Sequence, residues 1–365
     1  MAELYVDVPG LTRLYNQLVR ASGDATDALD YVHKHCDLRI LDQGFIMLMI
    51  GPHGEAYRSL TTALERLQTL TQGAGTQINR AQVEYSRTDH QSAKQLDAAY
   101  PGAKDPAAAA SAFTSHRPDL MPDDRAAFTD VAEATRALQN PQYAVGIEMW
   151  DINPLADLVS PAAWLRQTTI WVFGHDPLEG WASQFSGDWK AYVHCGNAMG
   201  RAGAACRLIS ENIAAAASDI PQAWRGNAAD GAREWLLGLA VATAGIAQVC
   251  SDYYDLYLQA AEAIKKLYDV VAGLITDLID MLIIISGALA AGAASIATIF
   301  GPIAGFSIAA YYAWQAYDLY KQISRFYGAA EDTLKLIGGS IGALDATLSM
   351  KAIPDVQPYH HPARY

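Results

Sequence analysis

The chain has 365 residues, with 26 Lys and Arg against 39 Asp and Glu, which gives a formal net charge of −13 at pH 7. Apolar residues make up 51% of the chain and charged residues 18%, which excludes a disordered acidic protein. The acidic balance argues against a nucleic-acid partner, because binding to nucleic acid depends on clustered Lys and Arg.

The cysteines do not form a disulfide framework in a chain of this length. Cys195 and Cys206 are eleven residues apart, which separates them by about 16 Å along one helix, too far for a disulfide bond. Cys36 follows His33 and His35, but no second cluster of ligands accompanies it, so we expect no metal site and no cofactor. Small buried side chains are predicted for all four cysteines: Cys36, Cys195, Cys206 and Cys250.

Residues 1–100 are predicted to form a helical hairpin. Apolar residues recur at three- and four-residue steps over 11–32 and again over 60–85, as on one face of an amphipathic helix. The sequence Gly51-Pro52-His53-Gly54 is a cluster of helix-breaking residues and predicts the turn between the two helices. We expect the second helix to end before Pro101.

Residues 101–180 hold eight of the fifteen prolines and predict a connector of short helices, because proline interrupts long ones. A second and longer hairpin is expected over 181–350, and the tail 351–365 is expected to be unstructured. The fold class is therefore predicted to be all-α: two long antiparallel helical hairpins packed as an elongated bundle.

The clearest periodicity lies in the first helix of the second hairpin, where nine residues step by three and four in strict alternation. Pro221 is expected to end that helix, and the return helix to run from about residue 228 to residue 280. The nine positions are Tyr192, Cys195, Met199, Ala202, Cys206, Ile209, Ile213, Ala216 and Ile220.

Residues 281–317 contain no charged side chain. One interpretation is a hairpin that inserts into a membrane, since 20 helical residues span about 30 Å, the thickness of a bilayer core. Small residues within the segment would let helices approach closely in lipid. The alternative is a helix buried on all sides in a long bundle.

Two short motifs accompany the hairpins. Trp224-x-Gly226 falls at the turn of the second hairpin, where glycine accepts backbone angles that other residues avoid. Tyr85-x-x-x-Asp89 falls at the end of the first hairpin, where positions i and i+4 of a helix would present the ring and the carboxylate side by side. The pair Tyr327 and Glu331 matches the second motif equally well, so the assignment stays open.

Together these motifs resemble the WXG superfamily of actinobacterial type VII (ESX) secretion substrates. The first hairpin is similar to small EspC-like proteins, and the second to the WXG-like N-terminal regions of secreted effectors and toxins. The combination looks like the fused PE–PPE arrangement of EspB-like proteins.

The resemblance implies a bipartite export signal, with Tyr85 and Asp89 on one hairpin and the Trp224 and Gly226 turn beside them on the other. We therefore predict that Tyr85 lies within about 20 Å of Trp224. The resemblance further implies a type VII secretion ATPase, and for some members a dedicated chaperone, as partners. It implies export, or retention in the cell envelope, without a cleaved signal peptide.

No motif predicts catalysis: the sequence has no nucleophile elbow, no phosphate-binding glycine loop and no paired His and acid signature. The predicted function is a type VII substrate that is exported folded and acts by binding or self-assembly. Two alternatives remain open: membrane insertion or pore formation through residues 281–325, and a structural homo-oligomer.

Overall fold

The computed structural model describes residues 4–38, 44–100, 111, 125–141, 163–185, 188–294 and 301–351. It confirms the all-α class, with one two-stranded sheet among the described residues. Of the expected tail, residues 351–365, Lys351 is the last residue of α10, and the residues after it lie outside the described part of the chain. The elements are β1 (Tyr5–Val6), α1 (Val8–Cys36), α2 (Met47–Arg87), α3 (His90–Ala99), the 3₁₀ helix η1 (Ala134–Ala137), α6 (Ala163–Phe173), α7 (Pro177–Gln184), α8 (Trp189–Ala223), β2 (Trp224–Arg225), α9 (Asn227–Ala294) and α10 (Gly301–Lys351).

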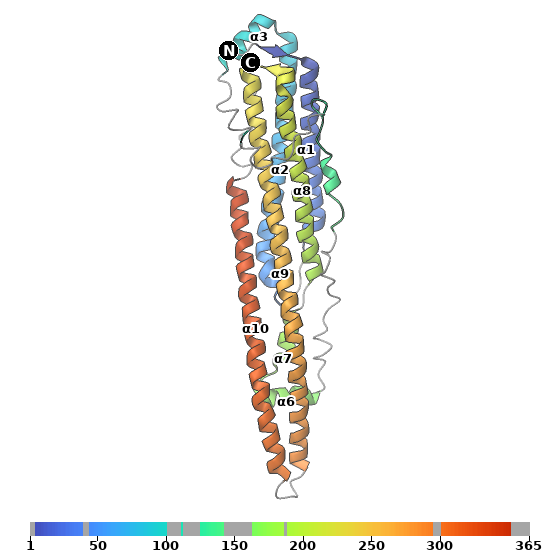
Figure 1. Ribbon diagram of the computed structural model, residues 1–365, viewed down its shortest axis with the longest axis vertical. Helices are drawn as coiled ribbons and strands as arrows, with labels where there is room; N and C mark the ends of the chain where they lie inside the picture. Colours follow the sequence, from blue (N-terminus) through green and yellow to red (C-terminus); the bar gives the residue numbers. More distant parts are fainter. Residues whose placement is uncertain are drawn as a thin grey trace.

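The protein is a long helical rod (Figure 1). Helix α9 alone has 68 residues, which corresponds to about 100 Å. At one end of the rod α1 packs on α2 and α8, and α8 packs along the first half of α9; at the other end α9 continues beside α10, with α6 lying across the pair. One continuous hydrophobic core joins the two halves of the chain.

Helices α8 and α9 run antiparallel in close contact. All nine residues of the predicted seam on α8 are buried. Two glycines of α8 allow the close approach: a Cβ built at Gly203 would lie 2.5 Å from Cβ of Cys250, and one at Gly196 would lie 2.6 Å from Cβ of Tyr257. The predicted end at Pro221 is wrong by two residues, since α8 continues through this proline to Ala223.

The expected turn at Gly51-Pro52-His53-Gly54 is wrong, because these residues lie inside α2. Pro52 removes one hydrogen bond near the start of the helix, and the tertiary contacts of His53 override that local signal. His53 is buried, with Nδ1 2.6 Å from the hydroxyl of Tyr257 and Nε2 3.1 Å from the carbonyl of Cys36. It therefore ties α2 to α9 and to the end of α1.

The described part of the connector departs from the predicted series of short helices. Residues 125–141 form a mainly non-helical strap, with the single turn η1, that lies along α1 and α8. The side chain of Asn212 accepts a hydrogen bond from the Val131 amide at 2.8 Å and donates one to the carbonyl of Ala132 at 2.8 Å. Further on, α6 and α7 are short helices, as expected.

Candidate functional site: the joint around Trp224

The turn between α8 and α9 is enclosed by three segments from the first hundred residues, and we call this assembly the joint. It consists of the Trp224–Gly226 turn, β1, the end of α2 and helix α3. Strand β1 pairs with the turn in antiparallel register, Val6 opposite Trp224 and Tyr5 opposite Arg225. The joint lies at the end of the rod where the label α3 stands in Figure 1.

The start of α1 fixes this pairing. The amide of Asp7 donates a hydrogen bond to the carbonyl of Ala223 at 2.6 Å, and the carboxylate of Asp7 caps α1 by accepting from the amide of Gly10 at 3.1 Å. A Cβ at Gly10 would lie 2.3 Å from Cβ of Ala223, so only glycine permits this approach. The N-terminal strand and the turn are therefore locked together by backbone contacts.

Trp224 is fully buried, and the Tyr85 ring packs against it. The ring centroids are 5.9 Å apart with an interplanar angle of 68°, an edge-to-face contact. This distance confirms the prediction that the two residues lie within about 20 Å of each other.

The pKa of Tyr85 is raised to about 12, mainly by burial and also by the nearby Asp97 carboxylate, while hydrogen bonding with the Trp224 side chain acts in the opposite direction. The Tyr85 phenol is therefore neutral at physiological pH. It contributes an aromatic ring and a hydrogen-bonding hydroxyl to the joint, and no charge.

Asp97 completes the joint and was not predicted. Its carboxylate accepts hydrogen bonds from the backbone amides of Asn227 at 2.9 Å and Ala228 at 3.0 Å, the first residues of α9. Gly226 occupies the N-cap position of α9, with φ of +132°, and a glycine has no side chain with which to cap the helix. Asp97 of α3 therefore caps α9 from a distant part of the chain.

The contact between α3 and α9 extends beyond this carboxylate. The Asn227 side-chain amide donates to the carbonyls of Asp97 at 3.2 Å and Tyr100 at 2.9 Å. The ring of Tyr100 lies over Gly231, where a Cβ would be 2.9 Å from its Cε1. The one signal of this arrangement in the sequence is Gly226, because a glycine before α9 has no side chain to cap that helix.

The expected placement of Tyr85 and Asp89 on one helix face is wrong. Helix α2 ends at Arg87, Thr88 is extended, and Asp89 caps α3 by accepting from the amides of Gln91 and Ser92, each at 3.0 Å. These hydrogen bonds, with the one from the Ser92 hydroxyl, lower the pKa of Asp89. The ring of Tyr85 is thus half-buried, whereas the Asp89 carboxylate is an exposed anion.

The alternative pair lies in a different part of the rod. Tyr327 is buried, donates a hydrogen bond to the carbonyl of Trp181 at 3.0 Å and stacks on Phe45 and on the Trp181 ring. Glu331 is exposed and pairs with Lys335 at 2.6 Å. The structure therefore does not bring this pair together with Trp224, and Tyr327 has the contacts of a core residue.

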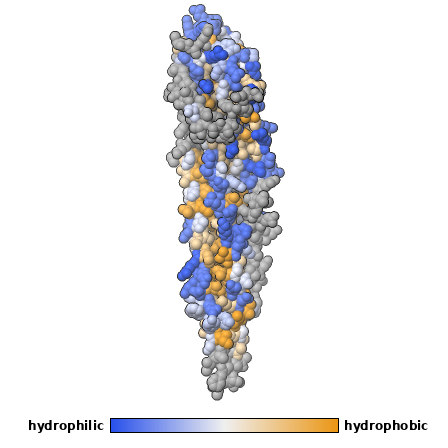
Figure 2. Space-filling model, in the orientation of Figure 1, coloured by the Kyte–Doolittle hydropathy of each residue, from blue (hydrophilic) through white to orange (hydrophobic). Residues whose placement is uncertain are grey.

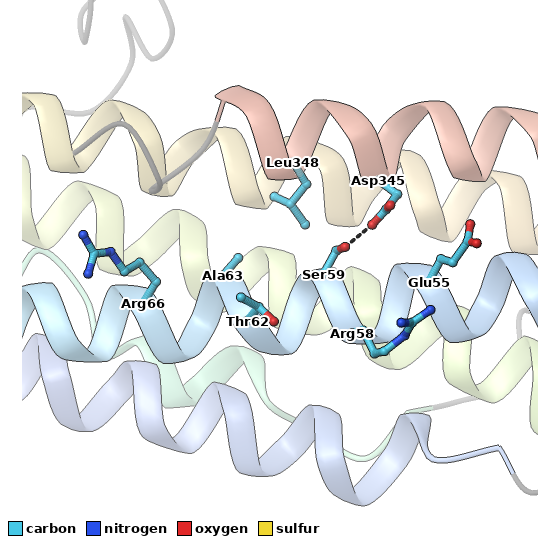
Figure 3. Close-up of a pocket in the computed structure, with 8 residues that line it drawn as sticks. All are labelled: Glu55, Arg58, Ser59, Thr62, Ala63, Arg66, Asp345 and Leu348. Carbon is cyan, nitrogen blue, oxygen red and sulfur yellow. Dashed lines mark hydrogen bonds between the residues drawn. The ribbon is translucent and has the colours of Figure 1, made fainter. Parts of the chain in front are cut away.

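A hollow lies between α2 and the end of α10 (Figure 3). It has a volume of about 790 Å³, and a hydrogen bond from the Ser59 hydroxyl to the Asp345 carboxylate joins the two helices within it. Its charged side chains come in both signs, with Glu55 and Arg58 exposed and Arg66 and Asp345 half-buried, and there is no histidine or cysteine among the residues that line it. The residues that line it are Glu55, Arg58, Ser59, Thr62, Ala63, Arg66, Asp345 and Leu348.

The thiol groups of the chain are buried. All four cysteines are free and buried, as predicted, and burial raises the pKa of the Cys195, Cys206 and Cys250 thiols. A raised pKa disfavours the thiolate, which is the nucleophilic form. Among the described residues, no group of three His, Cys, Asp or Glu side chains could hold a metal ion.

Comparison of the chain with protein-family models, with curated proteins and with solved structures gives no match.

Proposed function

We propose that this chain is a type VII secretion substrate that is exported folded and acts by binding or self-assembly. The observation that supports the proposal is the contact between Tyr85 and Trp224. In the family that the sequence resembles, the tyrosine signal and the Trp-x-Gly turn belong to paired hairpins, and in this chain both elements belong to one joint.

In this proposal the signal residues have different roles. Trp224 is fully buried and Gly226 adopts a left-handed conformation, so both shape the joint. Asp89 is exposed beside it and would contact the secretion ATPase. The rod would then be exported as a unit, because unfolding it would separate Tyr85 from Trp224.

The test is an immunoblot of culture filtrate and cell lysate from an actinobacterial host, with and without its secretion ATPase. Asp89→Ser removes the carboxylate but keeps a residue that caps helices well. Glu331→Ser is the matched control, because this acid is also exposed and also follows a tyrosine by four residues. Tyr85→Ala and Tyr85→Phe separate the role of the ring from that of the hydroxyl.

We expect the wild type in the filtrate only when the ATPase is present, with Asp89→Ser and Tyr85→Ala retained in cells and Glu331→Ser exported normally. Wild type that stays in the lysate regardless of the ATPase contradicts the proposal. Retention of Glu331→Ser together with normal export of Asp89→Ser would transfer the signal to the second pair.

A further inference from the structure

The far end of the rod combines the uncharged segment with an unusual amount of exposed apolar surface. Among the described residues, nine of the sixteen exposed large hydrophobic side chains lie on this end and on α6. Figure 2 shows apolar residues gathered over the lower half of the rod. The nine are Trp164, Ile170, Trp171, Ile283, Ile284, Ile308, Tyr311, Trp314 and Tyr317.

Burial on all sides, one of the two interpretations of residues 281–317, does not describe this region. Leu282, Ile285 and Ala309 are fully buried, but Ile283, Ile284 and Ile308 are exposed. Helix α9 is long and apolar enough to cross a membrane, and only 28% of its most apolar 18-residue window is buried. The core helix of a water-soluble bundle would bury most of such a window.

The exposed aromatic residues are not scattered over this end but lie where the uncharged segment meets the charged body. Tyr311, Trp314 and Tyr317 occupy the last two turns of the segment on α10, and Trp314 is 71% exposed. Helix α6 lies at the next turn, since Phe173 stacks on Tyr320 with centroids 5.1 Å apart. Its Trp164 and Trp171 are exposed there, and together these five residues form an aromatic girdle.

Along α10 the first cation beyond the girdle is Lys321, whose ammonium lies 4.5 Å from the centroid of the Tyr317 ring. On α6, Arg166 lies between the two girdle tryptophans in sequence and pairs with Asp176 at 3.3 Å. Tryptophan and tyrosine are enriched at the interfaces of membranes, and Lys side chains near them reach toward the headgroups. The acids Asp277, Asp280 and Asp318 flank the same boundary, so it is not a basic patch.

The length of the uncharged end also fits a bilayer. From Gly301 to Tyr317, α10 extends about 25 Å, compared with a hydrocarbon core of about 30 Å. Within the described parts of α9 and α10 every residue is helical, so backbone hydrogen bonds are satisfied inside each helix, as lipid requires. Gly and Ala residues are frequent along the segment and suit close helix packing.

We propose that the end of the rod formed by residues 281–294 of α9 and 301–317 of α10 inserts into a lipid bilayer as a pair of helices, with the aromatic girdle at the interface and the rest of the rod in water. Insertion is driven by apolar surface and by the girdle rather than by attraction to anionic headgroups. The proposal does not rest on the proposed function in secretion, and its test uses purified protein without a secretion system.

The test is flotation of the purified full chain with vesicles of zwitterionic phosphatidylcholine at pH 7, in 0.15 M and in 1 M NaCl. Ile308→Glu places a charge within the uncharged part of α10, and Val270→Glu places one on α9 above the girdle. The two side chains are 48% and 47% exposed, so in water the two substitutions disturb the fold equally little. Circular dichroism and size-exclusion chromatography with light scattering check folding and mass.

We expect the wild type and Val270→Glu to float at both salt concentrations, and Ile308→Glu to lose binding by at least about tenfold, because a charge within the hydrocarbon is strongly disfavoured. Absence of wild-type flotation, loss of binding in 1 M NaCl, or equal losses for the two variants overturns the proposal. A wild-type oligomer that Ile308→Glu converts to a monomer, without flotation, would assign the surface to a second copy of this chain and also overturns it.

Discussion

The carboxylate of Asp97 fills the space that a side chain at residue 226 would need. A Cβ built on Gly226 would lie 2.5 Å from Oδ2 of Asp97, and the glycine has φ of +132°, which other residues rarely adopt. Gly226 and Asp97 are thus coupled in two ways. The absence of a side chain at Gly226 leaves room for the Asp97 carboxylate, and that carboxylate supplies the helix cap that a glycine cannot.

Gly226→Ala should lower the free energy of unfolding by about 2–3 kcal/mol, through backbone strain and displacement of Asp97 from the amides of α9. Urea denaturation measures the change. Gly238→Ala is the matched control: Gly238 is an exposed residue inside α9 with no atom within 4 Å of a built Cβ. Alanine there should stabilise the protein by up to about 1 kcal/mol.

Asp97→Ala should also destabilise the protein, by about 2–3 kcal/mol, because it leaves two buried amide donors of α9 without their acceptor. The double variant Gly226→Ala/Asp97→Ala should be less destabilised than the sum of the single variants, by about 1 kcal/mol or more. Simple additivity in the denaturation cycle would show that the two residues act independently, against the geometry described above.

His53 makes stability depend on pH. Burial lowers the pKa of His53 from 6.5 to about 4, against the weaker opposing effects of the Cys36 carbonyl and of Asp37. Between these values the unfolded chain binds the proton and the folded chain does not, so acidification destabilises the fold. This residue should account for about 2 kcal/mol of the stability lost between pH 7 and pH 5.

The measurement is urea denaturation of the wild type and His53→Gln at the two pH values. Glutamine retains hydrogen-bonding groups but cannot take up the proton. The variant should be less stable at pH 7 but lose less stability on acidification. If both proteins lost the same free energy between pH 7 and pH 5, the pH effect would have to arise elsewhere.

Asp24 on α1 has the opposite dependence. The pKa of Asp24 is raised to about 6, mainly by burial and also by the neighbouring acids Asp130, Asp27 and Glu133, against the effect of Arg20. The folded state therefore favours the protonated form, and the contribution of Asp24 to stability falls as pH rises from about 4 to about 6.

Asp24→Asn should raise the Tm at pH 7.5, and the gain should disappear at pH 4, where the wild-type carboxyl is also uncharged in the folded protein. Differential scanning fluorimetry at the two pH values measures both. Asp30→Asn, an exposed acid on the same helix, serves as the control. A gain that persists unchanged at pH 4 would contradict the electrostatic origin of the effect.

The strap of residues 125–141 depends on a few side chains of α8. Asn212→Ala removes the hydrogen bonds to Val131 and Ala132 described above, whereas Asp219 still accepts from the Phe128 amide at 2.7 Å. We expect faster cleavage within the strap by a protease such as chymotrypsin, with a Tm loss of only a few degrees. Ser218→Ala should leave the cleavage rate unchanged, because the Ser218 hydroxyl donates its hydrogen bond to the carbonyl of Ala214 within the same helix.

The helical architecture was predictable because it depends on periodicity within each segment. The nine seam residues of α8 are all buried, since a repeat of three and four residues defines one face whatever lies opposite. The breaker cluster at Pro52 misled because the burial of His53, which depends on Tyr257 of a distant helix, outweighed local preference.

The joint was predictable in one contact and not in the others. The proximity of Tyr85 and Trp224 followed from the resemblance to paired hairpins. Asp97 was missed because its role depends on the break after Arg87, which redirects the chain into α3. Aspartate is a favoured helix N-cap residue, so Asp89 could have indicated that α2 ends before it and that a new helix begins after it.

The pairing of β1 with β2 also bears on the order in which the protein folds. It joins Tyr5 to Arg225, which are far apart in the sequence, whereas α8 and α9 meet through residues much closer in the sequence, such as Ser210 and Ala240. Closing a long loop costs more chain entropy than closing a short one, so we expect the α8–α9 hairpin to form early and the β1–β2 pair late. A nascent chain would then hold Trp224 uncovered until its own first residues return to it, and the covered tryptophan would mark a molecule that has finished folding.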